Sequence, residues 1–97
     1  MANILFIGES NMTGEVKVSE WVTLPKNARM RINSAIRRRK LIGGGTCWRF
    51  SDGSVHYSAC ISYWDGRPLN DKTQLKNEIL RILETEGGFL SIRVEIN

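Results

Sequence analysis

Hydrophobic and polar residues alternate over three stretches of the chain, which is the pattern of half-buried β-strands. These stretches are residues 15–24, 46–63 and 89–96, and a short apolar run at residues 4–7 adds a fourth candidate. Within residues 15–24 the expected buried face is Val16, Val18, Val22 and Leu24, and the opposite face is Lys17, Ser19, Trp21 and Thr23. Glu20 interrupts the apolar face, which indicates a β-bulge or a position at the sheet edge. Residues 9–14 have the composition of a polar loop.

The dipeptide Asp52-Gly53 divides residues 46–63 into the two arms of a hairpin, residues 46–51 and 54–63. This dipeptide favours a two-residue turn, and that turn fixes which residues face each other. The expected buried face then pairs Phe50 with Val55, Trp48 with Tyr57 and Thr46 with Ala59, and continues through Ile61 and Tyr63. The expected exposed face carries Cys47, Arg49, His56, Ser58, Cys60 and Ser62.

Two further stretches have the apolar spacing of amphipathic helices. The first begins at Pro25, is expected to end at the triple glycine of residues 43–45, and has the apolar stripe Ala28, Ile32, Ala35 and Ile36. The second begins at Asn70 or Asp71, ends at Gly87-Gly88, and has the stripe Leu75, Ile79, Ile82 and Leu83. A final strand over residues 89–96 turns Leu90, Ile92, Val94 and Ile96 to one side.

The order of these elements is strand, helix, strand, strand, helix, strand, with an extra strand in front. It predicts one α+β domain over residues 1–97, with an antiparallel sheet of four to five strands and two helices on one face. This is the ferredoxin-like, split βαβ order. The first strand is expected either to extend an edge or to form a hairpin with residues 15–24. A hydrophobic content of 41% is sufficient for the core of one domain of this size.

Charge is strongly segregated along the chain. The 31 residues between Glu20 and Asp52 contain no acid and eight cations, namely Lys26, Arg29, Arg31, Arg37, Arg38, Arg39, Lys40 and Arg49. The rest of the chain holds six cations and ten acids, so the net charge of +4 arises from a basic block in a slightly acidic chain. An unmixed basic block favours contact with phosphates or with an acidic protein surface.

The first helix brings several of these cations to one side. The side of the helix opposite the apolar stripe carries Lys26, Arg29, Arg37 and Lys40. Arg38 is expected at the flank of this basic side. These residues are the candidate contacts for phosphates, and Arg49 and Trp21 are secondary candidates. A structural explanation competes for Arg37 and Arg38, because cations in the last turn also interact favourably with the helix dipole.

The sheet face away from the helices is a second candidate surface. Trp21, Arg49, His56 and Arg93 are expected on it, where aromatic rings could stack on the bases of a single strand. RNA-recognition-motif domains share this topology and use that face. Residues 54–61 lack the basic-glycine-aromatic signature of that family, so the similarity is limited to topology.

The sequence shows little sign of catalysis. One histidine and two cysteines 13 residues apart do not match the ligand spacing of a zinc site. Cys47 and His56 are expected as diagonal neighbours on one hairpin face, with Arg49 nearby to favour a thiolate, and they are the one conceivable catalytic dyad. The triple glycine follows a helix, whereas a phosphate loop precedes one. We therefore expect no enzyme activity, no metal and no cofactor.

The predicted function is that of a non-enzymatic binding protein that contacts nucleic acid or a nucleoprotein complex through the basic helix. The alternative is a small protein-protein modulator, an inhibitor or adaptor of the phage or mobile-element type, that docks on an acidic surface. The second helix is acidic through Glu78, Glu84 and Glu86, so association of opposite surfaces into a homodimer is conceivable. Without an apolar run of about 20 residues or a signal-peptide core, a cytoplasmic location and no membrane contact are expected.

Overall fold

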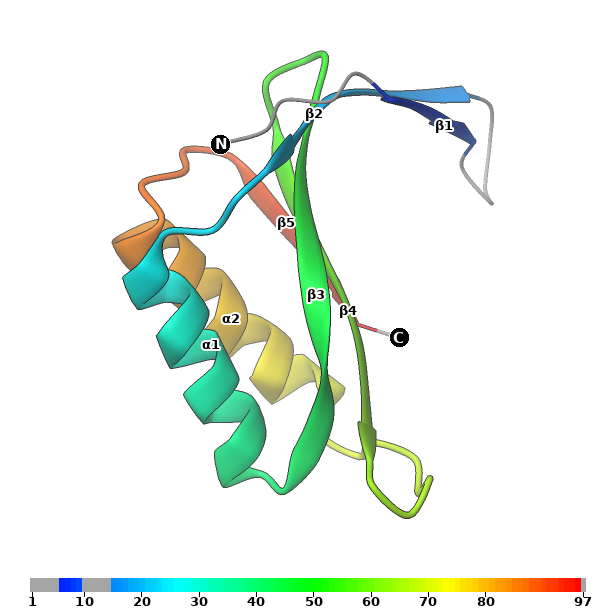
Figure 1. Cartoon of the computed structure of the whole chain (residues 1–97), viewed down its shortest axis with the longest axis vertical. Coiled ribbons are helices and arrows are strands. Elements are labelled where there is room, and N and C mark those ends of the chain that lie inside the picture. Colours follow the sequence, from blue (N-terminus) through cyan, green and yellow to red (C-terminus); the bar gives the residue numbers. More distant parts are fainter. Residues whose placement is uncertain (1–5, 10–14, 97) are drawn as a thin grey trace.

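Five strands and two helices are formed by residues 6–9 and 15–96, which the computed structural model describes. They are β1 (Phe6–Glu9), β2 (Glu15–Val22), α1 (Lys26–Arg38), β3 (Leu41–Phe50), β4 (Val55–Tyr63), α2 (Lys72–Glu86) and β5 (Ile92–Ile96). The fold is α+β, and the βαββαβ order after β1 is the one expected (Figure 1). Neither helix of the described chain is both long and apolar enough to cross a membrane.

The strands lie in the sheet in their order along the chain, from β1 to β5. Neighbouring strands are antiparallel as far as β4, but β4 and β5 are parallel. The expected all-antiparallel, ferredoxin-like sheet is therefore wrong in two respects. The sheet is mixed, and α2 carries the chain back to place β5 directly beside β4, whereas a split βαβ unit has another strand between the two. β1 forms a hairpin with β2 and ends the sheet on that side.

Both helices pack on one face of the sheet, and the other face is left without a helix (Figure 1). The apolar stripes predicted for both helices are buried. They meet the inward side chains of β4, of which Tyr57 is the largest, and Val94 of β5. The amphipathic period of the sequence was sufficient to predict which helix residues are buried, because burial in this core depends on which side of each helix is apolar.

The first helix ends earlier than expected. α1 stops at Arg38, and Lys40 adopts a left-handed conformation with φ of 56° before β3 begins. The triple glycine lies inside β3, so its predicted role as a helix terminator is wrong. Two of these glycines have steric reasons to be there. A Cβ on Gly43 would lie 2.1 Å from the backbone oxygen of Cys60, and one on Gly45 would lie 2.3 Å from the Tyr57 ring.

The β3–β4 hairpin has a three-residue loop, so the predicted register is wrong by one residue. The Phe50 N–H donates to the Ser54 carbonyl at 2.9 Å, and Gly53, with φ of 90°, donates to the Phe50 carbonyl. This is a turn closed by a glycine bulge. Trp48 consequently faces His56, and Cys47 faces Tyr57. A one-residue shift moves side chains to the opposite face.

The bulge indicated by Glu20 is present between Val18 and Glu20. The extra residue puts Val18 and Val22 on opposite faces of the sheet, contrary to the regular alternation predicted for them. The last strand also differs from its prediction, because β5 begins only at Ile92 and Leu90 is fully exposed ahead of it. The polar loop predicted for residues 9–14 falls largely outside the described residues, although Glu9 belongs to β1.

Candidate nucleic-acid interface

The solvent side of α1 carries Lys26, Arg29 and Arg37, and Lys40 follows just beyond its end. All four residues are exposed. None of them forms an ion pair with another residue of the described chain. Four of the cations predicted as contacts are thus available to an external anion. This basic face of α1, defined as Lys26, Arg29, Arg37 and Lys40, is the candidate interface.

Helix stability accounts for only part of the basic face. Arg37 in the last turn of α1 suits the negative end of the helix dipole. Lys26 and Arg29 lie in the first turn, where the dipole disfavours cations, and that turn contains no acid. The two N-terminal cations therefore work slightly against the helix that carries them.

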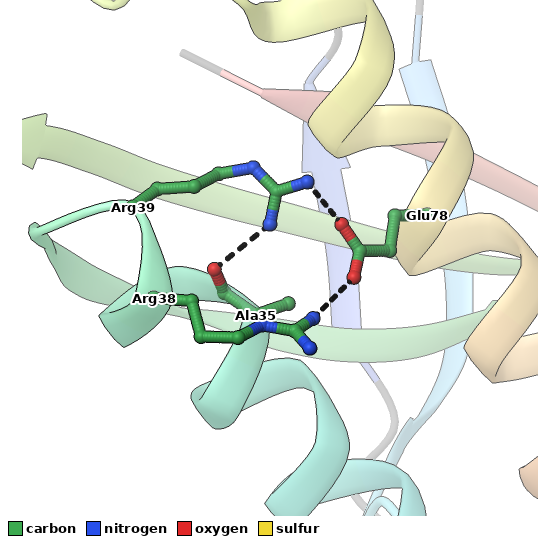
Figure 2. Close-up of polar contacts among 4 residues, drawn as sticks. All are labelled: Ala35, Arg38, Arg39 and Glu78. Carbon is green, nitrogen blue, oxygen red and sulfur yellow. Dashed lines mark hydrogen bonds and ion pairs between the residues drawn. The ribbon is translucent and has the colours of Figure 1, made fainter.

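The other arginines of this region, Arg31 and Arg38 of α1 and Arg39 just after it, form ion pairs within the fold. Arg38 donates to Glu78 of α2 at 2.7 Å, and Arg39 pairs with the second carboxylate oxygen of Glu78 (Figure 2). Arg39 also donates to the Ala35 carbonyl at 3.0 Å, and Arg31 pairs with Glu86. The acidic side of α2, which the sequence suggested as a surface for a second molecule, therefore serves largely as an internal partner for α1. Arg38, a predicted contact, is already occupied.

Arg49 lies on the helix side of the sheet, so its predicted position on the open face is wrong. It is opposite Val55 in the β3–β4 ladder and opposite Glu20 in the β2–β3 ladder. Its guanidinium pairs with the Glu20 carboxylate. The hairpin register explains the error, because the three-residue loop moves Arg49 to the opposite face from the one that a two-residue turn gives. Arg49 is thus a partner of the bulge residue.

The open face of the sheet carries an aromatic cluster, defined as Trp21, Trp48, Phe50 and His56. The Trp48 ring centroid is 5.7 Å from that of Trp21, 6.1 Å from that of Phe50 and 6.0 Å from that of His56. Trp21 pairs with Trp48, Trp48 with His56, and His56 with Arg93, so one row crosses four strands. Burial, together with the charge of Arg93, lowers the pKa of His56, so its ring is neutral at pH 7.

Sequence reasoning placed Trp21, His56 and Arg93 on this face but missed Trp48 and Phe50. Both had been assigned to the core because the two-residue turn pointed them inward. In the three-residue loop, the N–H and the hydroxyl of Ser54 both donate to the Asp52 carboxylate, and Gly53 takes the left-handed conformation that closes the loop.

Cys47 and His56, the one conceivable catalytic dyad, do not come together, because the two side chains lie on opposite faces of the sheet. Cys47 is buried beneath the helices, whereas His56 belongs to the open face. Burial raises the pKa of the Cys47 thiol to about 11, although Arg49 acts in the opposite direction. The thiol is therefore neutral and unreactive at pH 7. Among the described residues, no group of three or more metal-ligating side chains comes together.

A cleft of about 270 Å³ opens where β2 leaves the sheet, between α1 and β3. Arg29 and Asn33 of α1 lie on one side of it, and Thr46 and Cys47 of β3 on the other. Arg29 is thus the member of the basic face that borders a concavity. Comparison of the chain with protein-family models, with curated proteins and with solved structures found no match. The geometry alone therefore supports a proposal about function.

Proposed function

We propose that this chain is a non-enzymatic binding protein that contacts nucleic acid, or the nucleic acid of a nucleoprotein complex, through the basic face of α1. One observation supports the proposal above the others: Lys26, Arg29, Arg37 and Lys40 remain exposed without a described carboxylate, whereas three neighbouring arginines are paired. Cations that have no internal partner are available to phosphates, which dominate the affinity of nucleic-acid contacts.

The length of the basic face suits a backbone contact. Lys26 and Arg37 lie eleven residues apart, which corresponds to about 16 Å along a helix at ~1.5 Å per residue. That length spans about five base pairs at ~3.4 Å per pair. Contacts of this kind position a protein on a duplex or a single strand without reading the bases. The proposal is accordingly for binding with little sequence preference, at an expected cytoplasmic location.

A second candidate function is docking on an acidic protein surface, and Met30 favours it. Met30 lies next to the basic face on α1, and 54% of its surface is exposed. Methionine is enriched in protein interfaces and adds nothing to a phosphate contact. In this case α1 would present an apolar centre beside its cations, as a modulator of a larger protein would require.

Titration of fluorescent single- and double-stranded oligonucleotides tests the proposal. The chain is expected to bind at ~50 mM salt and to weaken steeply by ~200 mM. The variant K26E/R37E reverses two exposed cations and is expected to abolish binding without a change in thermal stability. The matched control M30A is expected to leave oligonucleotide affinity unchanged, but to weaken capture by an acidic protein. An absence of binding at low salt would contradict the nucleic-acid proposal.

A further inference from the structure

β5 is the last strand of the sheet, and only its β4 side is paired among the described residues. No described strand pairs with the backbone N–H and C=O groups of the other edge of β5, and such groups can template pairing with another chain. The strand has five residues, Ile92–Ile96. Arg93 and Glu95 are exposed on the open face, and their side chains form an ion pair at 3.0 Å. Val94 points to the core.

The sequence of β5 is complementary to itself when the strand is reversed. In an antiparallel pair centred on Val94, Arg93 lies opposite Glu95 of a second copy, and Glu95 lies opposite Arg93 of that copy. Ile92 lies opposite the second copy's Ile96 in the same register. Opposite charges that face each other on neighbouring strands stabilise a sheet, and apolar pairs add to this.

Other registers lack this match. A parallel, in-register pair puts Arg93 beside Arg93 of the second copy, and antiparallel pairs centred on Arg93 or Glu95 also place like charges opposite each other. A shift by one residue places Arg93 opposite Val94, so the open face of one copy would be continuous with the helix-bearing face of the other. Charges normally discourage edge pairing. Here only the antiparallel register centred on Val94 places Arg93 opposite Glu95 twice.

We propose that β5 pairs antiparallel with β5 of a second copy of this chain, in the register centred on Val94. The pair joins two sheets into one and is isologous, since each copy contributes the same strand. Because facing residues in this register share a side, the helices of both copies lie on one face of the joined sheet and both open faces lie on the other. The basic faces of two α1 helices are thereby presented on the same side. The proposal does not depend on what those faces bind.

A five-residue edge buries less surface than the ~1,600 Å² of a standard stable interface. The dimer is therefore expected to be weak, with association that rises over protein concentrations from about 10 μM to about 1 mM.

Sedimentation velocity of the full chain and of three charge variants tests the proposal. R93E and E95R each place like charges opposite each other twice in the dimer, and each is expected to weaken association at least about 10-fold. The double variant R93E/E95R restores opposite charges and is expected to return to the association of the unmodified chain. Both residues are exposed, so circular dichroism is expected to report an unchanged fold.

Three results would overturn the proposal. The first is an unmodified chain that stays monomeric throughout this concentration range. The second is single variants that associate as well as the unmodified chain, and the third is a double variant that stays as weak as the single ones. Oligonucleotide binding by the monomeric R93E variant separates the two proposals, because the basic face of α1 is intact in it.

Discussion

Arg38 near the end of α1 donates to the Glu78 carboxylate of α2 at 2.7 Å, across 40 residues of sequence. The same carboxylate also pairs with Arg39, so one acid of α2 is shared by two adjacent arginines at the C-terminal end of α1. The cations of the basic block between residues 26 and 40 thus fall into two groups. One group forms ion pairs between the helices, and the other faces solvent. The division is open to experiment.

Removal of the Glu78 charge is expected to strengthen nucleic-acid binding while it weakens the fold. E78Q releases Arg38, of which 67% of the side chain is already exposed, to contact a phosphate. The slope of log affinity against log salt is expected to steepen by about 1. The free energy of unfolding is expected to fall by about 1 kcal/mol, because Arg38 is largely solvent-exposed whereas Glu78 and Arg39 are only partly exposed. Oligonucleotide titration and urea denaturation measure the two effects.

Glu84 provides the matched control for this prediction. It lies on the exposed side of α2 and pairs with no cation of the described chain, so E84Q changes the net charge equally without releasing an arginine. An equal gain in affinity for E84Q and E78Q would show that net charge alone matters, and the division between paired and free cations would lose its functional meaning.

The aromatic cluster is expected to contribute to stability and not to the contact made by α1. W48A removes the ring that touches Trp21, Phe50 and His56, and a loss of about 2 kcal/mol in the free energy of unfolding is expected. Oligonucleotide affinity is expected to stay within about twofold, since the cluster and α1 lie on opposite sides of the sheet. W48F, which keeps a ring, is the control. A selective loss of single-strand binding in W48A would relocate the contact to the open face.

Gly45 is expected to be intolerant of any side chain. A Cβ there would come within 2.3 Å of the ring of Tyr57, which is buried. G45A is therefore expected to lower the free energy of unfolding by about 2 kcal/mol through overpacking. The neighbouring G44A is the control, because nothing lies within 4 Å of its added methyl group. Equal stabilities of the two variants would contradict the packing of Tyr57 over β3.

Stability is expected to decline in alkaline solution. Burial raises the pKa of Cys47 from its ordinary value of 9.0 to about 11, and that of Tyr57 from 10.0 to about 12. The unfolded chain therefore loses these protons first, and stability falls as the pH rises from about 9 to about 12. Urea denaturation at several pH values measures the decline in the free energy of unfolding. C47A is expected to remove the part of that decline that begins near pH 9. A stability that is independent of pH over this range would contradict the burial of both groups.

The sequence predicted the helices well, because each has one apolar stripe and the stripe alone decides which side is buried. In α1, for example, one side of the helix is buried as a unit and carries Ala28, Ile32 and Ile36. The order of elements followed from the same reasoning. The sheet was less accessible to prediction, because the path of α2 back to the edge beside β4 depends on tertiary packing and not on any local signal.

The hairpin shows why the candidate surfaces were only partly predicted. Asp52-Gly53 is compatible with a two-residue turn and with a wider loop, and β3 has apolar residues on both faces, so its pattern does not choose between them. The one-residue difference moved Trp48 to the open face and Arg49 away from it. The ion pair of Arg38 was not predicted for another reason, since its partner Glu78 is distant in the sequence.

The salt dependence of oligonucleotide binding, measured for R37Q and R38Q beside the unmodified chain, tests the central claim most directly. The two substitutions remove the same charge from residues next to each other on α1, but Arg37 is free and Arg38 is held by Glu78. The unmodified chain is expected to show a slope of about −3 to −4 in log affinity against log salt, which corresponds to four phosphate contacts. R37Q is expected to reduce the magnitude of the slope by about 1, and R38Q to leave it unchanged. A slope near zero for the unmodified chain, or equal slopes for R37Q and R38Q, would contradict a contact made by the basic face of α1.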